Sequence, residues 1–296
     1  MTQQKKQPPL WIRSLVLLRP TGGPAVELLA RLTSACAAFS EAMAFHFCGA
    51  PHRAKAFQGT AAEIERLIAQ SRPAAGAGQD LPVFFWTDKD NPRVSLSLGR
   101  EFHALRRQYD KAEFNFALDR PLVGDGGHFS FNELVRFFSI CVEAWQAATG
   151  AVHDSQLVEI AANHITVEEM KRQLPPSEHK YIPRSEVVRS VPKDLAERLG
   201  RYRHPKGFDV TLIPEAVYWI NYWNERQIDH IGTERVLAAP WALREPHPCG
   251  GYVLASQTEQ FDALNARHLE KLAAIVDAVD LFSAQGKRVT SQKAAR

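Results

Sequence analysis

The chain has 296 residues, of which 45% are hydrophobic and 23% are charged, as in an ordinary soluble globular protein. These proportions exclude a chain that is mostly disordered. The net charge of +3 is too small to indicate a nucleic acid or a membrane as partner. The four cysteines contain no C-x-x-C pair, so they indicate neither a disulfide framework nor a zinc ribbon.

The N-terminal residues predict no targeting or membrane segment. The apolar run 10–18 is interrupted by Arg13 and Ser14, whereas a secretory signal needs a continuous apolar region of about 7 to 15 residues. No stretch reaches the roughly 18 apolar residues that a spanning helix requires. We therefore expect a cytoplasmic protein with reduced thiols and no membrane association, and we interpret the run 10–18 as a first strand.

Residues 1–164 are expected to form an N-terminal α+β part. Apolar residues recur at helical spacing from Val26 to Phe39, and 43–48 is typical of a short strand. Thr60 and Glu63 have the spacing of a capping box, in which each side chain accepts a hydrogen bond from an amide at the helix start. They predict a helix that ends near Gln70, followed by a connector over 73–78.

The second half of this part contains a predicted hairpin and a central helix. Val83–Trp86 and Val94–Leu98 read as paired strands, and Glu113–Leu118 alternates apolar and polar residues as a half-solvated strand does. Ser130 and Glu133 form a second capping box before a helix that we expect to end at Gly150. Its apolar stripe comprises Leu134, Phe137, Phe138, Cys141, Val142 and Trp145.

Residues 165–206 differ in composition from their surroundings. They hold ten basic and six acidic residues and five prolines, with little apolar periodicity. We interpret 165–206 as a basic connecting segment. Residues 207–284 are expected to form a C-terminal α+β part that packs with the first into one compact unit, and 285–296 form a basic tail.

The C-terminal part begins with an aromatic block. Ala216–Trp223 carries aromatic and β-branched residues on both alternating faces, which predicts a strand covered on both sides. Asn224 with Gln227 can cap the next helix, and a strand is expected over 250–254. A final helix is predicted to open at Ser256. Because strands and helices alternate irregularly, we expect an α+β fold with a mainly antiparallel or mixed sheet covered by helices.

The common catalytic and cofactor motifs are absent. The sequence lacks the glycine-rich phosphate loops, H-E-x-x-H and G-x-S-x-G. Three weaker patterns are Asp125 with His128 on a glycine loop, two S-x-x-K matches at 177–180 and 190–193, and His247 with Cys249. Each is more typical of an ordinary turn than of a site. We therefore predict no catalytic residue, no metal and no cofactor.

The distribution of charge favours a protein partner. Residues 207–282 contain eleven acidic and five basic residues, a net charge of −6, which would repel a nucleic acid backbone. The aromatic block is therefore not interpreted as a base-stacking platform. Because residues 1–20 and 165–206 are basic, the acidic last third could attract a basic protein to one surface.

Three features together resemble a known family. The block Val217–Trp223, the short helix ending at Ile231 and Gly232, and the strand from Gly250 to Leu254 are similar to the C-terminal half of an uncharacterised bacterial family. That family is related to the immunity-protein-fifty-two group of polymorphic toxin systems. The resemblance is specific around Asn221–Trp223 and at Gly250 and Gly251.

The resemblance implies a cytoplasmic immunity protein that binds a cognate toxin. In such systems the toxin is often delivered by a type VI secretion machine and is frequently a nuclease. An acidic surface could occupy the basic groove with which a nuclease holds phosphate. The expected partner contacts are the carboxylates of Asp229, Glu234 and Glu245 and the rings of Tyr218, Tyr222 and Trp241.

Two alternatives belong to other functional classes. One is a hydrolase that uses His128 with Asp125, because a base and an acid precede a helix there. The other is an adaptor of the secretion apparatus, which would co-purify with that machinery in the absence of the toxin. The rings of the aromatic block could equally be buried core residues.

Overall fold

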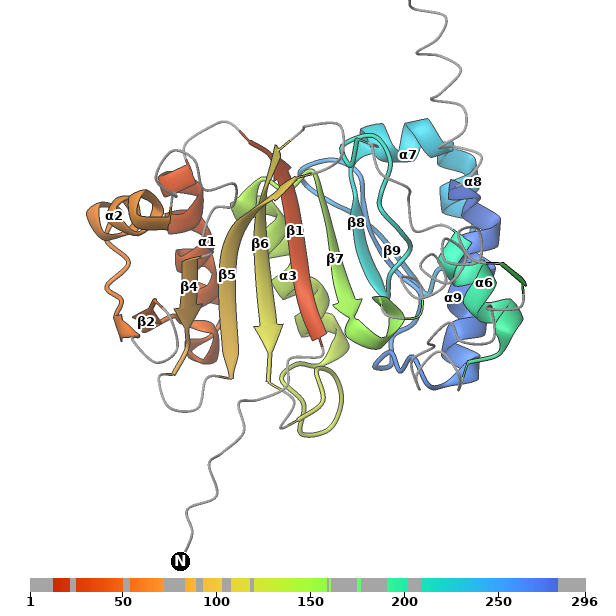
Figure 1. Cartoon of the computed structure of the whole chain (residues 1–296), viewed down its shortest axis with the longest axis horizontal. Helices are drawn as coiled ribbons and strands as arrows, with labels where there is room; N and C mark the ends of the chain where they lie inside the picture. Colours follow the sequence, from red (N-terminus) through yellow and green to blue (C-terminus); the bar gives the residue numbers. More distant parts are fainter. Residues whose placement is uncertain are drawn as a thin grey trace, which may run out of the picture.

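The computed structural model describes residues 13–21, 25–49, 54–71, 83–88, 93–102, 108–117, 120–158, 160, 175–176, 191–201 and 209–281. In these ranges the strands form one ten-stranded sheet in the order β3-β2-β4-β5-β6-β1-β7-β8-β10-β9. Figure 1 shows the sheet running through the middle of the molecule, with helices at both ends and behind it.

Every pairing between the named strands is antiparallel, which confirms the predicted α+β class. The strands are β1 (Arg13–Pro20), β2 (Phe47–Cys48), β3 (Lys55–Ala56), β4 (Val83–Trp86), β5 (Val94–Phe102), β6 (Gln108–Phe116), β7 (Thr149–Asp154), β8 (Ile220–Trp223), β9 (Leu243–Pro246) and β10 (Tyr252–Ala255). The helices are α1 (Ala25–Phe39), the 3₁₀ helix η1 (Glu41–Met43), α2 (Ala61–Ser71), α3 (Phe131–Trp145), α6 (Lys193–Arg201), α7 (Glu225–Ile231), α8 (Thr233–Ala238) and α9 (Ala266–Val279).

The two faces of the sheet differ because side chains alternate along each strand. On β1, Leu15 and Leu17 are fully buried on the face that α3 covers. Gly150 of β7 lies on this face too: a Cβ there would come 2.7 Å from Leu17 Cδ2 and 3.2 Å from Phe138 Cζ of α3. Val16 and Leu18 therefore point to the opposite face, where they form a small separate apolar cluster with Tyr109, Val210 and Ile213.

Helix α3 forms where the sequence predicted it. The Ser130 hydroxyl accepts a hydrogen bond from the Glu133 amide, and the Glu133 carboxylate accepts one from the Ser130 amide, which completes the capping box. The predicted apolar stripe is buried against the sheet. The helix ends at Trp145, earlier than expected, because Gln146 takes a left-handed conformation as its C-cap.

The capping box gives α3 a pH-dependent contribution to stability. Hydrogen bonds from Ser130 lower the pKa of Glu133. A lowered pKa means that the contribution is present above the unfolded value of about 4.3 and is lost as the pH falls through the folded value. We expect the melting temperature of Glu133→Gln to lie below that of the wild type at pH 7, with the gap closing at lower pH. A gap that stays constant from pH 7 to about 3 would contradict this assignment.

Strand β7 is the longest strand that the sequence analysis missed. Residues 149–154 lie in the centre of the sheet, between β1 and β8. Gly150 was read as a helix stop, whereas it is a strand residue at a position with no room for a side chain. The pairing of β7 with β8 makes the sheet continuous between residues 13–154 and 220–255. The predicted domain boundaries stay a prediction.

Two other predicted boundaries are wrong. Helix α9 begins after Asn265, whose side chain accepts a hydrogen bond from the Arg267 amide, and not at Ser256. The expected strand Ala216–Trp223 is shorter, because the Asn221 side chain bonds both the amide and the carbonyl of Tyr218 and holds that stretch outside the sheet. The connector 73–78, both S-x-x-K serines, most of 165–206 and the tail 285–296 lie outside the described residues.

Candidate functional site

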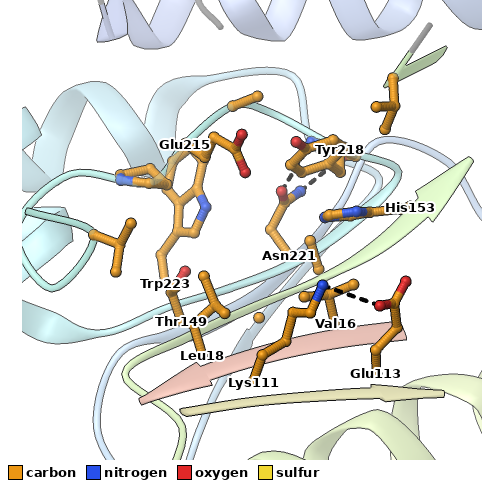
Figure 2. A pocket seen from close by; sticks show the side chains of 16 residues that line it. Val16, Leu18, Lys111, Glu113, Thr149, His153, Glu215, Tyr218, Asn221 and Trp223 are labelled. Carbon is orange, nitrogen blue, oxygen red and sulfur yellow. Dashed lines mark hydrogen bonds and ion pairs between the residues drawn. The ribbon is translucent and has the colours of Figure 1, made fainter. Parts of the chain in front are cut away.

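A pocket lies on the face of the sheet that α3 does not cover. Its floor consists of two rows of directly paired residues on β6, β1, β7 and β8. The rows are Glu113, Val16, Ala151 and Asn221, and next to them Lys111, Leu18, Thr149 and Trp223. Figure 2 shows Val16, Leu18, Lys111 and Glu113 below the segment that carries Glu215 and Tyr218. The cavity has a volume of about 140 Å³.

An ion pair occupies the β6 side of the floor. Lys111 Nζ lies 3.1 Å from the Glu113 carboxylate, and the two side chains are 31% and 25% exposed. They belong to one strand and one face, because residues two apart point the same way. The partial exposure keeps this side of the pocket open to solvent.

Two stacked rings form another wall. The rings of His153 and Tyr218 have centroids 4.1 Å apart and planes inclined by 26°. Asn221 is fully buried beside them, and its amide group makes hydrogen bonds of 2.9 and 2.8 Å to the backbone of Tyr218. The wall is therefore held in a fixed conformation before any ligand arrives.

The segment 209–219, which roofs the pocket, is anchored at its start by Asp209. This buried carboxylate accepts hydrogen bonds from the Tyr109 hydroxyl at 3.1 Å and from the Thr211 amide at 3.0 Å. Tyr109 belongs to β6, so the contact ties the roof to the floor.

The capping box of α7 anchors the same segment. Asn224 and Gln227 cap the helix as predicted, through reciprocal bonds to each other's amides. The Gln227 side-chain amide also donates to the Val210 carbonyl at 2.6 Å, and that of Asn224 donates to the Ala148 carbonyl at 2.5 Å. Asn224 and Gln227, which the sequence predicted as helix caps, therefore also keep the roof segment 209–219 in place.

Charged side chains line the pocket on two sides. Glu113 faces the cavity from the floor and Glu215 from the roof, while Lys111 is paired with Glu113. The remaining lining includes apolar and aromatic side chains, Val16, Leu18, Val158, Val210 and Trp223 among them, and the polar side chains of Thr149 and Asn221. A site of this kind can hold a small charged group with an aliphatic or planar stem.

The structure separates the three predicted acidic contacts. Asp229 of α7 and Glu234 of α8 are exposed in consecutive short helices, and the Thr233 hydroxyl between them donates to Asp229. Glu245 lies elsewhere: it lines a groove of about 480 Å³ between β9 and the outer side of α3. Its neighbour Arg244 points the other way, to the Leu237 carbonyl at the end of α8.

The three predicted aromatic contacts are largely enclosed. Tyr222 is 1% exposed and donates to the Gly250 carbonyl, and burial raises its pKa to about 12. Trp241 donates to the Val236 carbonyl and packs edge-on against Trp223. Tyr218 is 5% exposed and lines the pocket. A partner could reach Tyr218 through the pocket.

His128 and Asp125, the residues of the alternative hydrolase site, line neither the pocket nor the groove beside Glu245. A ring nitrogen of His128 lies 3.2 Å from the Ala117 carbonyl, and its ring packs near Phe116 and Phe129. Asp125 is exposed on the glycine loop. His247 bonds the Ser139 carbonyl and the Cys249 amide. Within the described ranges, no group of three His, Cys, Asp or Glu residues has the arrangement of a metal site.

Sequence reasoning missed Lys111, Glu113, His153 and Glu215 as site residues. They come from β6, β7 and the roof, more than 100 positions apart at the extremes, and form no contiguous motif. One signal was present: Glu113 falls on the polar side of the alternation that predicted β6. The residues that lie beside Glu113 on the neighbouring strands could not be predicted without the order of the strands in the sheet.

Comparison with known proteins gives little further information. No protein-family model matches the sequence, and no curated protein sequence matches it significantly. Among solved structures, the chain resembles the Pseudomonas aeruginosa T6SS protein PA0821 with a TM-score of 0.47 and 11% sequence identity. The superposition covers 94% of this chain and 76% of that one. A likeness of this degree says nothing about activity or partners.

The fold and the site define an α+β protein whose described strands form a ten-stranded antiparallel sheet with a preformed pocket on one face. In the part of the chain that the structure describes, no helix has the length and apolar character needed to cross a membrane.

Proposed function

We propose that this protein is an immunity protein, which binds a cognate antibacterial toxin in the producing cell and neutralises it without catalysis. The toxin would be of the kind that type VI secretion delivers, for example a nuclease. The main support is an acidic surface on α7 and α8, formed by Glu225, Asp229 and Glu234. All three carboxylates are exposed.

The arrangement of these carboxylates slightly destabilises the folded chain. Glu225 and Asp229 are four residues apart on α7, so their like charges repel by about 0.2 to 0.5 kcal/mol. Within the described residues, none of the three carboxylates has an ion-pair partner. Arg235 of α8 is instead paired with Asp280. The exposed Arg226 of α7 offsets part of this negative charge, and the remaining excess would attract a basic partner to the surface over distance.

Co-expression tests the proposal directly. The product of the neighbouring gene is expressed alone and with this chain in a sensitive host, and growth is measured. We expect the neighbouring product to stop growth and this chain to restore it. The proposal fails if the neighbouring product is harmless, or if it stops growth equally when the chain is present.

The acidic surface has its own prediction. The double variant Asp229→Asn/Glu234→Gln should slow association with the purified toxin about tenfold at low salt and weaken its salt dependence, because exposed charges at an interface act mainly on the association rate. Stopped-flow or surface plasmon resonance measures this rate. The matched control is Glu65→Gln, an exposed carboxylate on α2 at the opposite end of the sheet (Figure 1). Equal rates for the double variant and the control would show that α7 and α8 do not face the toxin.

A further inference from the structure

We infer that the groove between α3 and β9 receives an extended basic segment of the partner protein. The inference rests on the proposed function for the source of that segment, and it concerns a surface separate from Asp229 and Glu234. It assigns a role to Glu143 and Glu245, two carboxylates that line the groove.

The shape of the groove suits an extended segment of chain. One side consists of α3 residues from Asn132 to Glu143 at helical spacing, and the other consists of β9 and the turn that follows it. At 1.5 Å per residue the helical side is about 16 Å long, which matches about five residues of extended chain at about 3.3 Å each. The volume of about 480 Å³ admits several side chains of such a segment.

The charges that line the groove favour a basic segment. Within the described residues, neither Glu143 nor Glu245 has an ion-pair partner. Arg136 is the only lysine or arginine among the described residues of the lining, and its guanidinium carbon lies 5.7 Å from the centre of the Phe39 ring. Two carboxylates and one arginine leave an excess of one negative charge, which attracts a basic segment and disfavours an acidic one.

His247 of the lining adds no charge. Its Nδ1 accepts a hydrogen bond from the Cys249 amide, so this nitrogen carries no proton. The proton is therefore on Nε2, which donates to the Ser139 carbonyl of α3 at 3.2 Å. The same two bonds hold the turn after β9 against α3, so the groove is formed before a ligand arrives.

This turn also connects the groove with the acidic start of α7. A Cβ on Gly250 would come 3.0 Å from Glu225 Cδ, so the first carboxylate of α7 lies against the turn. Burial raises the pKa of the Cys249 thiol and the Glu143 carboxylate raises it further, whereas Arg31 of α1 lowers it. With Glu225 and Arg31 included, three carboxylates and two arginines again leave one negative charge. A basic segment in the groove would thus continue the contact proposed for α7.

The first test uses pentalysine, titrated into the intact protein at low salt and followed by NMR chemical shifts. We expect saturable shifts of the groove residues, with a Kd of about 1 mM or below, and no such shifts with pentaglutamate. Groove resonances that do not move at ~20 mM pentalysine, a concentration that would fill a site with this Kd, overturn the inference. Equal shifts with pentaglutamate overturn it too.

Variants separate a basic occupant from an acidic one. Glu143→Gln/Glu245→Gln keeps the shape of the groove and should weaken pentalysine binding there at least about tenfold, because it removes both carboxylates. Arg136→Gln should tighten this binding several-fold, because it removes a like charge. If Arg136→Gln weakens it instead, the arginine holds the occupant and the inference is wrong. Unchanged melting temperatures establish that the variants remain folded.

A matched control excludes a general effect of net charge. Glu65→Gln/Glu270→Gln removes two exposed carboxylates from α2 and α9 and should change pentalysine binding at the groove less than about twofold. If this control weakens binding as much as the groove variant does, the groove carboxylates have no special role and the inference is wrong.

The partner's contribution is tested with the toxin. Glu143→Gln/Glu245→Gln should lose at least about tenfold in affinity for the toxin that the wild-type chain neutralises. If this variant binds and protects as well as the wild type, the toxin does not occupy the groove and the inference is wrong, although the immunity function stands. If the wild-type chain gives no protection, the proposed function fails first, and pentalysine alone then decides whether the groove takes a basic segment.

Discussion

Replacing Gly251 by alanine is expected to lower the free energy of unfolding by at least about 3 kcal/mol. Gly251 has φ +77°, a left-handed conformation that costs a residue with a Cβ about 1 to 2 kcal/mol. A Cβ would also overlap the carbonyl oxygen of Trp223 and lie 2.7 Å from Asn224 Cα. Both neighbours are backbone atoms at the end of β8, so they cannot move aside without disturbing the sheet. Denaturation in urea measures the loss.

A second glycine separates the two causes. Gly126 has φ +70°, but a Cβ there would meet no atom within 4 Å. Gly126→Ala should therefore cost only the conformational part, about 1 to 2 kcal/mol. If the two variants lose the same stability, the close approach of Gly251 to β8 has no energetic consequence and our account of this position is wrong.

Replacing Phe137 by alanine is expected to cost about 3 to 5 kcal/mol, because the cavity cannot collapse within a rigid cluster of rings. Phe137 of α3 is fully buried. Its ring centroid lies 5.2 Å from that of Phe39, 5.5 Å from that of Phe114 and 5.4 Å from that of Phe129. The cluster thus joins α1, α3 and β6.

The same denaturation experiment checks this value, with Asn132→Ala as the control. Asn132 is an exposed residue of the same helix, and its replacement should change stability by about 0.5 kcal/mol or less. Phe137→Leu should fall between the two, because leucine fills part of the space. A loss below about 1 kcal/mol for Phe137→Ala would show that the ring cluster is not a rigid part of the core.

Local signals in the sequence predicted most of the helices and several strands correctly. The capping boxes at Ser130 and Asn224 placed the starts of α3 and α7 to the residue, because a cap is decided by side chains within three positions. Thr60 also caps α2, although Glu63 there accepts from the Gln58 amide and not from Thr60. The hairpin of β4 and β5 followed from two apolar runs and a turn.

Strand β7 was not predicted because the strands that stabilise it by pairing lie far from it in the sequence. The sequence Thr-Gly-Ala-Val-His-Asp has no strong alternation, and Gly150 suggested the end of a helix. Its place between β1 and β8 is set by partners about 130 residues before it and 70 after it. The start of α9 was misjudged for a different reason: the residues from Ser256 onward have the spacing of a cap, but Asn265 supplies the observed one.

The sequence by itself determined the α+β class, the caps, the apolar faces of the helices and the excess of negative charge in the last third. Each of these depends on residue type and on spacing along a short stretch. Only the tertiary structure decided which strands are neighbours, and therefore that Lys111, Glu113, His153 and Glu215 surround one pocket while Glu245 lies apart from Asp229 and Glu234. The physical reason is that strand order is selected by the burial of the whole sheet, to which every element contributes and which no short segment encodes.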